Sequence, residues 1–179
     1  MYIPAYGLIF PQVKNYKIRA GVKMKYWLMK TEPRTYSWED LKNEPEQTTC
    51  WEGVRNYQAR NMMRDEMKKG DKVFIYHSVI KPMAIMGIAE VVKESYPDYF
   101  SRNPESRYFD PKSTQENPRW FMVDVKAIRD INPPVTLEEL KKIPELENMM
   151  LLRKGSRLSI QPVTKNEFEI ILKLRNIEF

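Results

Sequence analysis

The 179-residue sequence contains one cysteine and one histidine, and this scarcity restricts the chemistry available to it. With Cys50 alone, no disulfide can form within the chain, which favours a reducing compartment. A Cys/His zinc site needs roughly three or four such ligands, more than the chain supplies. Nucleophilic catalysis of the Ser-His-Asp or Cys-His kind would depend on His77 alone. Most hydrolases are therefore disfavoured, and we expect neither a metal nor a cofactor.

Long apolar segments are also missing. No apolar run approaches the roughly 20 residues that a membrane span requires. The first residues have no basic start before their apolar stretch, and Pro4, Gly7 and Pro11 interrupt that stretch, so a secretory signal is not expected. Together with the lone cysteine, these features predict a cytoplasmic protein without membrane association.

Basic residues, in contrast, are abundant. Lysine and arginine total 30 against 24 for aspartate and glutamate, a formal net charge of +6. Such an excess favours a polyanionic partner such as nucleic acid. Net charge affects association, however, and does not indicate the fold. Hydrophobic residues make up 42% of the chain, which is enough for a packed core. The length fits one domain, or one domain with a tail.

The first 23 residues differ from the rest, because their prolines, aromatics and basic residues follow no clear period. Met24 then opens a strand-like aromatic and aliphatic run over residues 25–29. We therefore predict an N-terminal extension over residues 1–23 and one domain over residues 24–179.

Capping signals predict several short helices. Capping boxes begin at Ser37, Thr136 and Thr164, each with an acidic residue three positions later. Asn56 is suited to cap a further helix over residues 57–69 that ends at Gly70.

Period-two alternation predicts the strands, and Gly87 is expected at a bulge or a close backbone approach. The polar stretch 96–118 reads as a long loop, and loops of that length are usually functional or disordered. We expect an α+β domain of about five or six strands that curl into a barrel, with short helices between them. Besides residues 25–29, the expected strands are 71–77, 83–94, 120–131 and 156–163.

An ordered series of motifs resembles one known family. The motifs are Tyr26–Pro33 (YWLMKTEP), Tyr36–Trp38 (YSW), Trp51–Asn61 (WEGVRNYQARN), Gly70-Asp71, Tyr76–Ser78 (YHS), Tyr96–Asp98 (YPD), Asp110–Ser113 (DPKS), Pro118–Trp120 (PRW) and Arg153–Val163 (RKGSRLSIQPV). From about residue 24 to residue 174, this series is similar to the EVE domain of the PUA-like superfamily. Residues before Met24 match nothing in that family, and without a long basic tail the free-standing bacterial members are the nearer match.

The resemblance implies a PUA-like pseudo-barrel with flanking short helices. It also implies a pocket for a modified base, such as methylated or hydroxymethylated cytosine, in DNA or RNA. The expected partner is therefore nucleic acid carrying modified bases.

A base taken out of its stack needs an aromatic face and hydrogen bonds to its edge. We expect Trp27 and Trp51 to supply that face, and Trp38 and Trp120 to be buried. The Asn56 amide offers a donor and an acceptor for a base edge, while helix capping is its alternative role. The predicted base pocket comprises Trp27, Lys30, Tyr36, Ser37, Trp51, Val54, Arg55, Asn56, Tyr57, Ser78, Gln161 and Pro162. The predicted phosphate contacts at its rim are Arg60, Lys112, Arg119 and Arg157.

Structural roles are expected for the single histidine and the single cysteine. His77 continues a strand beyond Phe74 and Tyr76, which predicts a partly buried imidazole with satisfied hydrogen bonds. Cys50 has no basic neighbour in the sequence to lower its pKa, so packing is the expected role.

Three functions remain open from the sequence. The leading one is a non-catalytic nucleic-acid-binding module. The alternative is an ASCH-like enzyme acting on a nucleoside, nucleic acid or small amide, with Lys30 or Asp110 as a group of shifted pKa. The third is a structural protein that dimerises through its N-terminal arm, and the expected assembly is a monomer or a weak homodimer.

Overall fold

The computed structural model describes residues 24–179, so the predicted N-terminal extension and any dimer contact through it lie outside the described residues. Six strands form one mixed sheet in the order β2-β5-β4-β3-β1-β6. β1 and β3 pair in parallel, and the other neighbouring pairs are antiparallel. The strands are β1 (Tyr26–Thr31), β2 (Thr48–Cys50), β3 (Lys72–His77), β4 (Ala84–Pro97), β5 (Phe121–Thr136) and β6 (Ile160–Val163).

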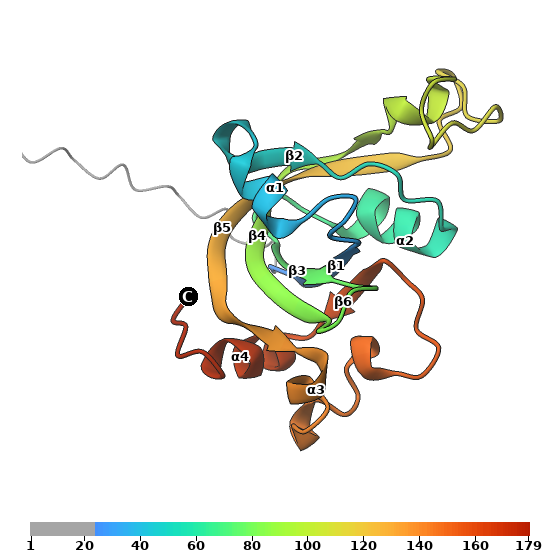
Figure 1. The fold of residues 1–179 in the computed structure, drawn as a ribbon. Helices are drawn as coiled ribbons and strands as arrows, with labels where there is room; N and C mark the ends of the chain where they lie inside the picture. The colour runs from blue at the N-terminus through green and yellow to red at the C-terminus, as the bar shows by residue number, and fades with distance from the viewer. Residues whose placement is uncertain (1–23) are drawn as a thin grey trace, which may run out of the picture.

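The two longest strands, β4 and β5, run side by side and bend the sheet (Figure 1). Register shifts along this pair provide the bends, because a bulge bends its strand and increases the local twist. The edge strands β2 and β6 do not pair with each other in the described part of the chain. The expected α+β pseudo-barrel is confirmed, although the sheet does not close completely.

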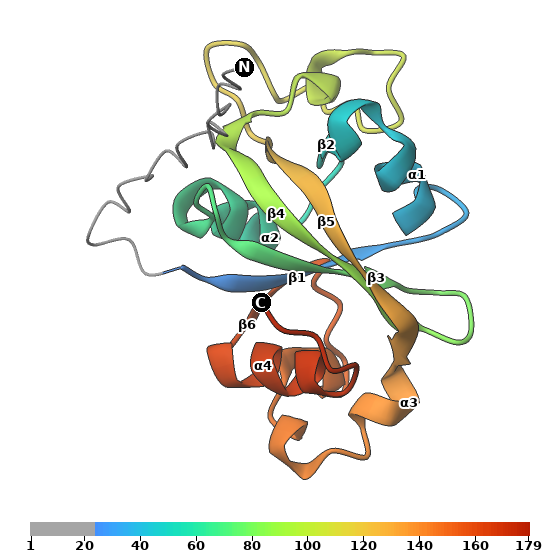
Figure 2. The ribbon, with the colours of Figure 1, turned by 90° about the vertical axis from the view of Figure 1, so that its left-hand side faces the viewer.

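Short helices pack on both faces of the sheet, and Figure 2 shows α3 and α4 together on one side, away from α1 and α2. Alternation along the strands supplies a separate core for each face: Trp27 and Met29 join one, and Leu28 joins the other. The helices are α1 (Trp38–Asn43), α2 (Tyr57–Asn61), α3 (Leu137–Leu140) and α4 (Lys165–Lys173). Short helical turns are η1 (Pro45–Gln47), η2 (Met62–Glu66), η3 (Tyr99–Arg102), η4 (Pro144–Leu146) and η5 (Met150–Leu152).

The predicted capping boxes are present at Ser37, Thr136 and Thr164, where each hydroxyl accepts a backbone N–H bond from the third helical residue. The helix after Asn56 differs from expectation. Its regular part ends at Asn61, and the chain continues as one turn of π-helix, η2, through Glu66.

Strand lengths were predicted less well than strand existence. β4 extends beyond its predicted end because the start of the presumed loop pairs across the sheet, Tyr96 with Met122 and Pro97 with Phe121. β5 extends to Thr136 because Val135 and Thr136 pair with Ile85 and Ala84. β2 has three residues and was not predicted. The last strand begins at Ile160, four residues later than expected. Such pairings join distant segments, so local periodicity does not reveal them.

Gly87 is a point of close approach, as predicted. A Cβ atom there would lie 2.2 Å from Cζ2 of Trp38, so only glycine admits the indole. The Trp38 indole donates to Asp130 at 2.5 Å, and its backbone N–H donates to Nε2 of His77 at 2.9 Å. The predicted burial of Trp38 and the satisfied, half-buried His77 are both confirmed, and burial lowers the pKa of His77. These contacts hold the start of α1 against the sheet.

Candidate nucleic-acid interface

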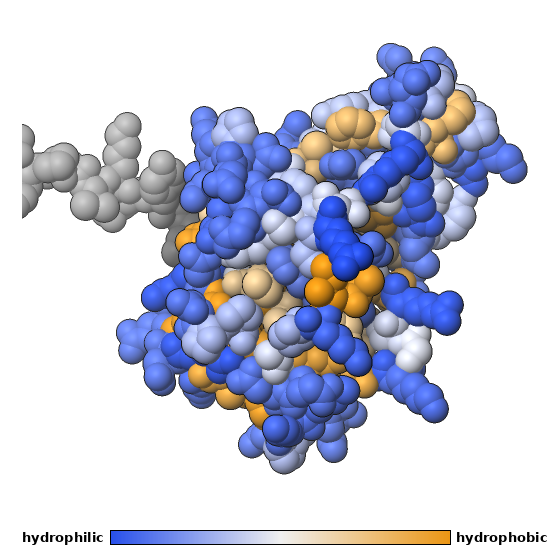
Figure 3. Space-filling model, in the orientation of Figure 1, coloured by the Kyte–Doolittle hydropathy of each residue, from blue (hydrophilic) through white to orange (hydrophobic). Residues whose placement is uncertain are grey.

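A cavity of about 790 Å³ lies where the end of β1 meets the segment after β2 and the loop that follows β4. Its residues come from separate parts of the chain, so only the fold assembles them. They are Lys30, Thr31, Glu32, Thr35, Tyr36, Glu44, Thr49, Cys50, Trp51, Glu52, Gly53, Val54, Arg55, Asn56, Phe100, Arg107, Tyr108 and Ser159. On the face shown in Figure 3, hydrophilic side chains predominate and hydrophobic ones form smaller patches.

Aromatic rings form part of the cavity wall. Tyr36 and Trp51 meet edge to face, with ring centroids 6.5 Å apart and planes at 89°. Trp51 is almost fully buried, which holds this corner in place. The Tyr36 hydroxyl lies 3.4 Å from Oε1 of Glu44, and burial raises the pKa of Tyr36 to about 12. The phenol is therefore a neutral hydrogen-bonding group at ordinary pH.

Tyr108 forms the opposite wall by packing directly on the backbone of Gly53. A Cβ atom at position 53 would lie 2.4 Å from Cζ of Tyr108. Gly53 also has a φ of +78°, in the left-handed region that glycine tolerates best. Close approach and backbone conformation therefore both require glycine here.

Arg55 ties this wall to the domain. Its Nε donates to the carbonyl of Tyr108 at 3.0 Å, and its Nη1 donates to Oδ2 of Asp98 at 2.8 Å. The guanidinium also lies 5.4 Å from the Tyr108 ring centroid and 5.3 Å from that of Trp120. The Asp98 side chain is completely buried and also accepts from the backbone N–H groups of Gly53 and Phe100. Arg55 is thus a structural brace as well as a lining residue.

Two lining side chains keep donor capacity toward the cavity. Nζ of Lys30 has a long contact of 3.4 Å with the carbonyl of Ser156, and burial lowers the Lys30 pKa. Oδ1 of Asn56 accepts from the backbone N–H of Ala59 at 3.0 Å, so the amide caps α2. Capping leaves Nδ2 as the group of Asn56 that is available to a ligand. Asn56 therefore has the capping role that the sequence offered as its alternative, and the reading of a base edge stays a prediction.

Several residues predicted for the pocket lie elsewhere. Trp27 is 1% exposed, and its indole donates to Oδ2 of Asp71 at 2.9 Å, so it belongs to the core. Gln161 is also buried and donates to Leu158, while the neighbouring Pro162 is exposed on an edge strand. All three residues lie in the paired part of β1 and β6, and none of them lines the cavity.

Two serines predicted for the pocket also have structural roles. Ser37 caps α1 through the backbone N–H of Asp40. Ser78 donates to the carbonyl of Thr31 at 3.0 Å and so joins the ends of β3 and β1.

Tyr57 and the predicted rim residues lie outside the cavity. The Tyr57 ring stacks on Trp120, which is buried as expected. Nη1 of Arg60 donates to the carbonyl of Arg119 at 2.8 Å, so these two arginines are neighbours. Lys112 and Arg157 are exposed at separate places, and the cavity lining includes neither.

The sequence did not single out several lining residues. Gly53 stood within the quoted Trp51–Asn61 motif. Arg107 and Tyr108 lie in the long loop, whose length predicted a functional or a disordered segment. Cys50 was expected to pack and instead lines the cavity half-buried, where burial raises its pKa to about 11. Its thiol is therefore not activated.

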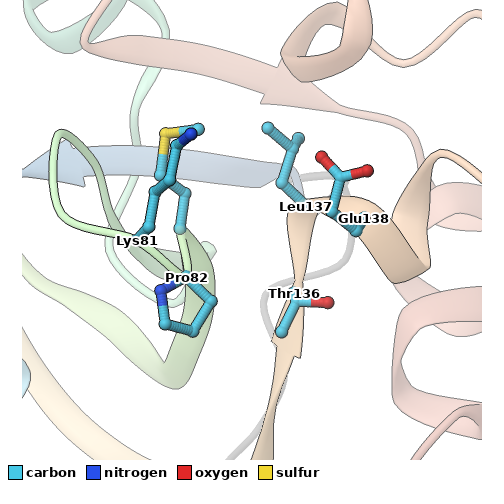
Figure 4. Close-up of a pocket in the computed structure, with 6 residues that line it drawn as sticks. Lys81, Pro82, Thr136, Leu137 and Glu138 are labelled. Atoms are coloured by element: carbon cyan, nitrogen blue, oxygen red, sulfur yellow. The ribbon is translucent and has the colours of Figure 1, made fainter.

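A second hollow of about 440 Å³ lies between the start of β4 and the start of α3. Figure 4 shows Lys81 and Pro82 on one side of it and Thr136, Leu137 and Glu138 on the other. No aromatic ring lines it, so it offers no stacking surface for a base.

Residues 24–179 show neither a metal-binding cluster nor a membrane-spanning helix. These residues contain no group of three or more His, Cys, Asp and Glu side chains arranged to hold a metal ion. No helix in the same range has the length and apolar character needed to cross a membrane.

The chain is similar to proteins of known structure. Human thymocyte nuclear protein 1 is 44% identical over 170 residues, which cover 86% of this chain and 75% of that protein. A hypothetical protein from Leishmania major superposes with a TM-score of 0.80 at 45% identity, covering 86% of this chain and 96% of that one. Human THYN1 in complex with DNA containing 5-methylcytosine superposes with a TM-score of 0.80 at 42% identity, covering 87% and 99%.

The EVE domain family matches residues 25–174, which is most of the chain. The match agrees with the quoted motifs and with the six-stranded pseudo-barrel. The chain therefore belongs to the EVE domain family.

Proposed function

We propose that this chain is a non-catalytic nucleic-acid-binding module that accepts a modified cytosine, such as 5-methylcytosine, in its aromatic-walled cavity. The observation that carries the proposal is the cavity between Tyr36, Trp51 and Tyr108, bordered by the free amide group of Asn56. Human THYN1, a relative of 42% identity, forms a complex with DNA containing 5-methylcytosine, which supports the same ligand class here.

The size and walls of the cavity suit one base. Ligand pockets commonly have volumes of roughly 300–1,000 Å³, and this cavity has about 790 Å³. The rings of Tyr36, Trp51 and Tyr108 come from three segments and offer surfaces on which a flat heterocycle can stack. Each base–aromatic stack contributes about 1–3 kcal/mol to binding. A base reaches such a cavity only after it leaves the duplex stack.

Both kinds of hydrogen-bonding group surround the space. Lys30 and Asn56 supply donors, which suit the ring nitrogen and carbonyl acceptors of cytosine. The carboxylates of Glu32, Glu44 and Glu52 supply acceptors, which suit its exocyclic amine. The lining therefore pairs with a cytosine edge without requiring proton transfer.

Phosphate contacts would come from basic side chains beyond the cavity. Arg107 borders the opening and is exposed, and Arg60 and Arg119 form a neighbouring basic pair. Arg60, Lys112, Arg119 and Arg157 remain our proposed phosphate contacts. These charges would give affinity that depends on salt, while the cavity would supply selectivity for the base.

The observed contacts of the candidate catalytic groups favour binding over catalysis. Nζ of Lys30 contacts a backbone carbonyl, not a carboxylate. Burial raises the pKa of the Cys50 thiol, which disfavours the nucleophilic thiolate. Nε2 of His77 accepts a backbone N–H bond and does not line the cavity. Asp110 accepts from the backbone N–H of Lys112 and from the Trp120 indole, and these bonds, together with the charge of Arg119, lower its pKa.

Titration of labelled oligonucleotides tests the proposal. We expect duplexes with one 5-methylcytosine or 5-hydroxymethylcytosine to bind more tightly than the unmodified duplex of the same sequence. Affinity should fall as salt rises, with a slope of about −0.9 per phosphate contact for duplex DNA. Parallel RNA titrations would identify the preferred nucleic acid. Binding that stays undetectable at low salt for every modified substrate contradicts the proposal.

Lys30→Met separates binding from stability. We expect weaker oligonucleotide binding, because a donor at the base is lost, together with a small gain in stability at pH 7. The sign follows from the lowered pKa: in the folded state the charged ammonium is disfavoured by burial, and this cost persists until the pH rises through the Lys30 pKa. Because Lys30 is only half-buried, the gain should stay below about 1 kcal/mol.

Thermal unfolding at pH 7 and pH 10, together with the oligonucleotide titration, checks the Lys30 prediction. The stability difference between Lys30→Met and the natural protein should shrink at the higher pH. Lys154→Met, which changes an exposed lysine outside the lining, is the control. Unchanged binding by Lys30→Met would remove Lys30 from the base site.

Other features of the module stay predictions. They are the cytoplasmic location, the domain boundary at residue 24 and the monomeric or weakly dimeric state. Light scattering of the full chain and of a chain starting at Met24 would test the last two together.

A further inference from the structure

Tyr57 presents an exposed aromatic ring just outside the cavity. The ring is 47% exposed and lies in the first turn of α2, directly after the lining residue Asn56. It does not line the cavity itself, so the base-binding role first expected for it inside the pocket is wrong.

The position of the ring is fixed from behind. Tyr57 and Trp120 stack with centroids 4.9 Å apart and planes at 23°. Trp120 is buried, and its indole donates to Oδ2 of Asp110 at 2.7 Å. The guanidinium of Arg119 donates to the Tyr57 hydroxyl. A ring held in this way loses little conformational freedom when a ligand stacks on it, which favours binding.

Two cations accompany the ring. The Arg60 and Arg119 guanidinium carbons lie 4.8 and 5.7 Å from its centroid. Arg119 pairs with Asp110 at 3.3 Å, whereas Arg60 forms no ion pair with a carboxylate within residues 24–179. Partial burial and the like charges of Arg64 and Arg119 lower the pKa of Arg60. An anion bound beside Arg60 would offset the repulsion between these positive charges.

The stacking continues from this surface to the cavity wall. The Arg55 guanidinium lies 5.3 Å from the Trp120 centroid and 5.4 Å from the Tyr108 centroid, and Arg107 lies 4.5 Å from the Tyr108 centroid. Tyr57 and the cavity are therefore connected through one series of stacked groups. A strand of nucleic acid with one base in the cavity has its neighbouring nucleotides near this surface.

We propose that Tyr57 and Arg60 form a second nucleotide subsite, in which the base next to the one in the cavity stacks on Tyr57 while its phosphate pairs with Arg60. This inference rests on the proposed function, because the cavity defines which nucleotide is the neighbour. Arg60 donates to Oδ1 of Asn61 and to the Arg119 carbonyl, and these neutral acceptors do not balance its charge. A flat ring beside a guanidinium without a carboxylate partner is the combination that single-stranded nucleic-acid sites use. A lone ring between arginines lacks the broad apolar patch of a protein-docking surface.

The test compares a free nucleoside with a short oligonucleotide. The probes are 5-methyl-2′-deoxycytidine and a single-stranded pentanucleotide with 5-methylcytosine at its centre. We expect Tyr57→Ala to leave nucleoside affinity unchanged and to weaken pentanucleotide binding roughly 5- to 150-fold, the range of one base–aromatic stack. An abasic site at one flanking position should weaken binding to the natural protein by a similar factor and have little further effect on Tyr57→Ala.

Matched variants separate stacking from folding. Tyr57→Phe keeps the ring and should bind the pentanucleotide nearly as well as the natural protein. Phe179→Ala removes another exposed aromatic ring, 59% exposed and 5.5 Å from the Lys72 ammonium, and should have no effect. Arg60→Gln should weaken the pentanucleotide and reduce the salt slope, without changing nucleoside affinity.

Each outcome bears on the inference. Equal losses for nucleoside and pentanucleotide in Tyr57→Ala, or no loss for either, overturn the second subsite. If the natural protein binds no nucleoside but Tyr57→Ala still weakens the pentanucleotide, the cavity proposal fails while stacking on Tyr57 stands. If an abasic site at a flanking position weakens binding to Tyr57→Ala as much as binding to the natural protein, the second subsite is also overturned.

Discussion

Asp98→Ala is expected to destabilise the domain by about 3 kcal/mol and to abolish selective binding of modified oligonucleotides. The Asp98 side chain is completely buried and accepts from Arg55, Gly53, Phe100 and Ser101. Removing it takes away the carboxylate partner of Arg55 and the side-chain acceptor of the Gly53 and Phe100 N–H groups, and leaves Arg55 with carbonyl acceptors alone. The estimate is at the lower end for a broken buried pair, because the Arg55 side chain retains 24% exposure.

The effect on binding follows from the same contacts. Asp98 holds Arg55, and Arg55 holds the Tyr108 carbonyl at the cavity wall. Thermal unfolding should show a melting temperature lower by about 6–12 °C for a domain of this size. Oligonucleotide titration should be performed well below that temperature, so that the folded fraction stays high.

Asp65→Ala is the matched control for Asp98→Ala. Asp65 also pairs with an arginine, Arg64 at 2.7 Å, but the pair is exposed to solvent and should contribute little to stability. If both variants unfold at the same temperature, the buried pair does not brace the domain. If Asp98→Ala loses stability but keeps full selectivity, the link from Asp98 to the cavity wall is wrong.

Gly53→Ala is expected to weaken binding of modified oligonucleotides at least tenfold. The added Cβ would lie 2.4 Å from the Tyr108 ring, so the ring must move away from the cavity wall. The φ of +78° adds a cost of about 1–2 kcal/mol for a residue with a side chain. Stability should therefore fall as well, as measured by chemical or thermal unfolding.

Gly70→Ala is the control that distinguishes backbone strain from the clash with Tyr108 in Gly53→Ala. Gly70 also has a positive φ, +98°, but nothing lies within 4 Å of its added Cβ. This variant should lose stability through backbone strain alone and keep its binding. Gly53→Ala should show the additional loss of binding that comes from Tyr108. Equal binding by the two variants would mean that Tyr108 is not part of the base site.

Much of the fold was readable from the sequence because its signals are local. The capping boxes at Ser37, Thr136 and Thr164 depend on residues three positions apart, and all are present. Alternation along residues 73–77 correctly placed Val73 and Ile75 on one face and Phe74 and Tyr76 on the other. Strand ends and the short β2 depend on pairing with distant segments, and local patterns do not encode that pairing.

Six residues predicted for the pocket line the cavity, and two of them, Lys30 and Tyr36, come from separate motifs. The Trp51–Asn61 motif supplied Trp51, Val54, Arg55 and Asn56, which line the cavity together. Trp27 stood in an equally distinctive motif, yet its indole points to buried Asp71. A tryptophan beside polar neighbours looks the same in a sequence whether its face of the strand meets the core or a cavity.

By itself, the sequence determined the family, the α+β class, the capped helices and the two-faced strands, since each depends on residue order and short-range spacing. The tertiary structure alone decided which aromatic rings enclose space and which fill it. Tyr108 reaches the cavity because Gly53 lacks a side chain and Asp98 holds Arg55 beneath the loop, and the segment of Gly53 and Arg55 is far in the chain from that of Asp98 and Tyr108. Their proximity arises from the packing of the loop after β4 against the segment after β2.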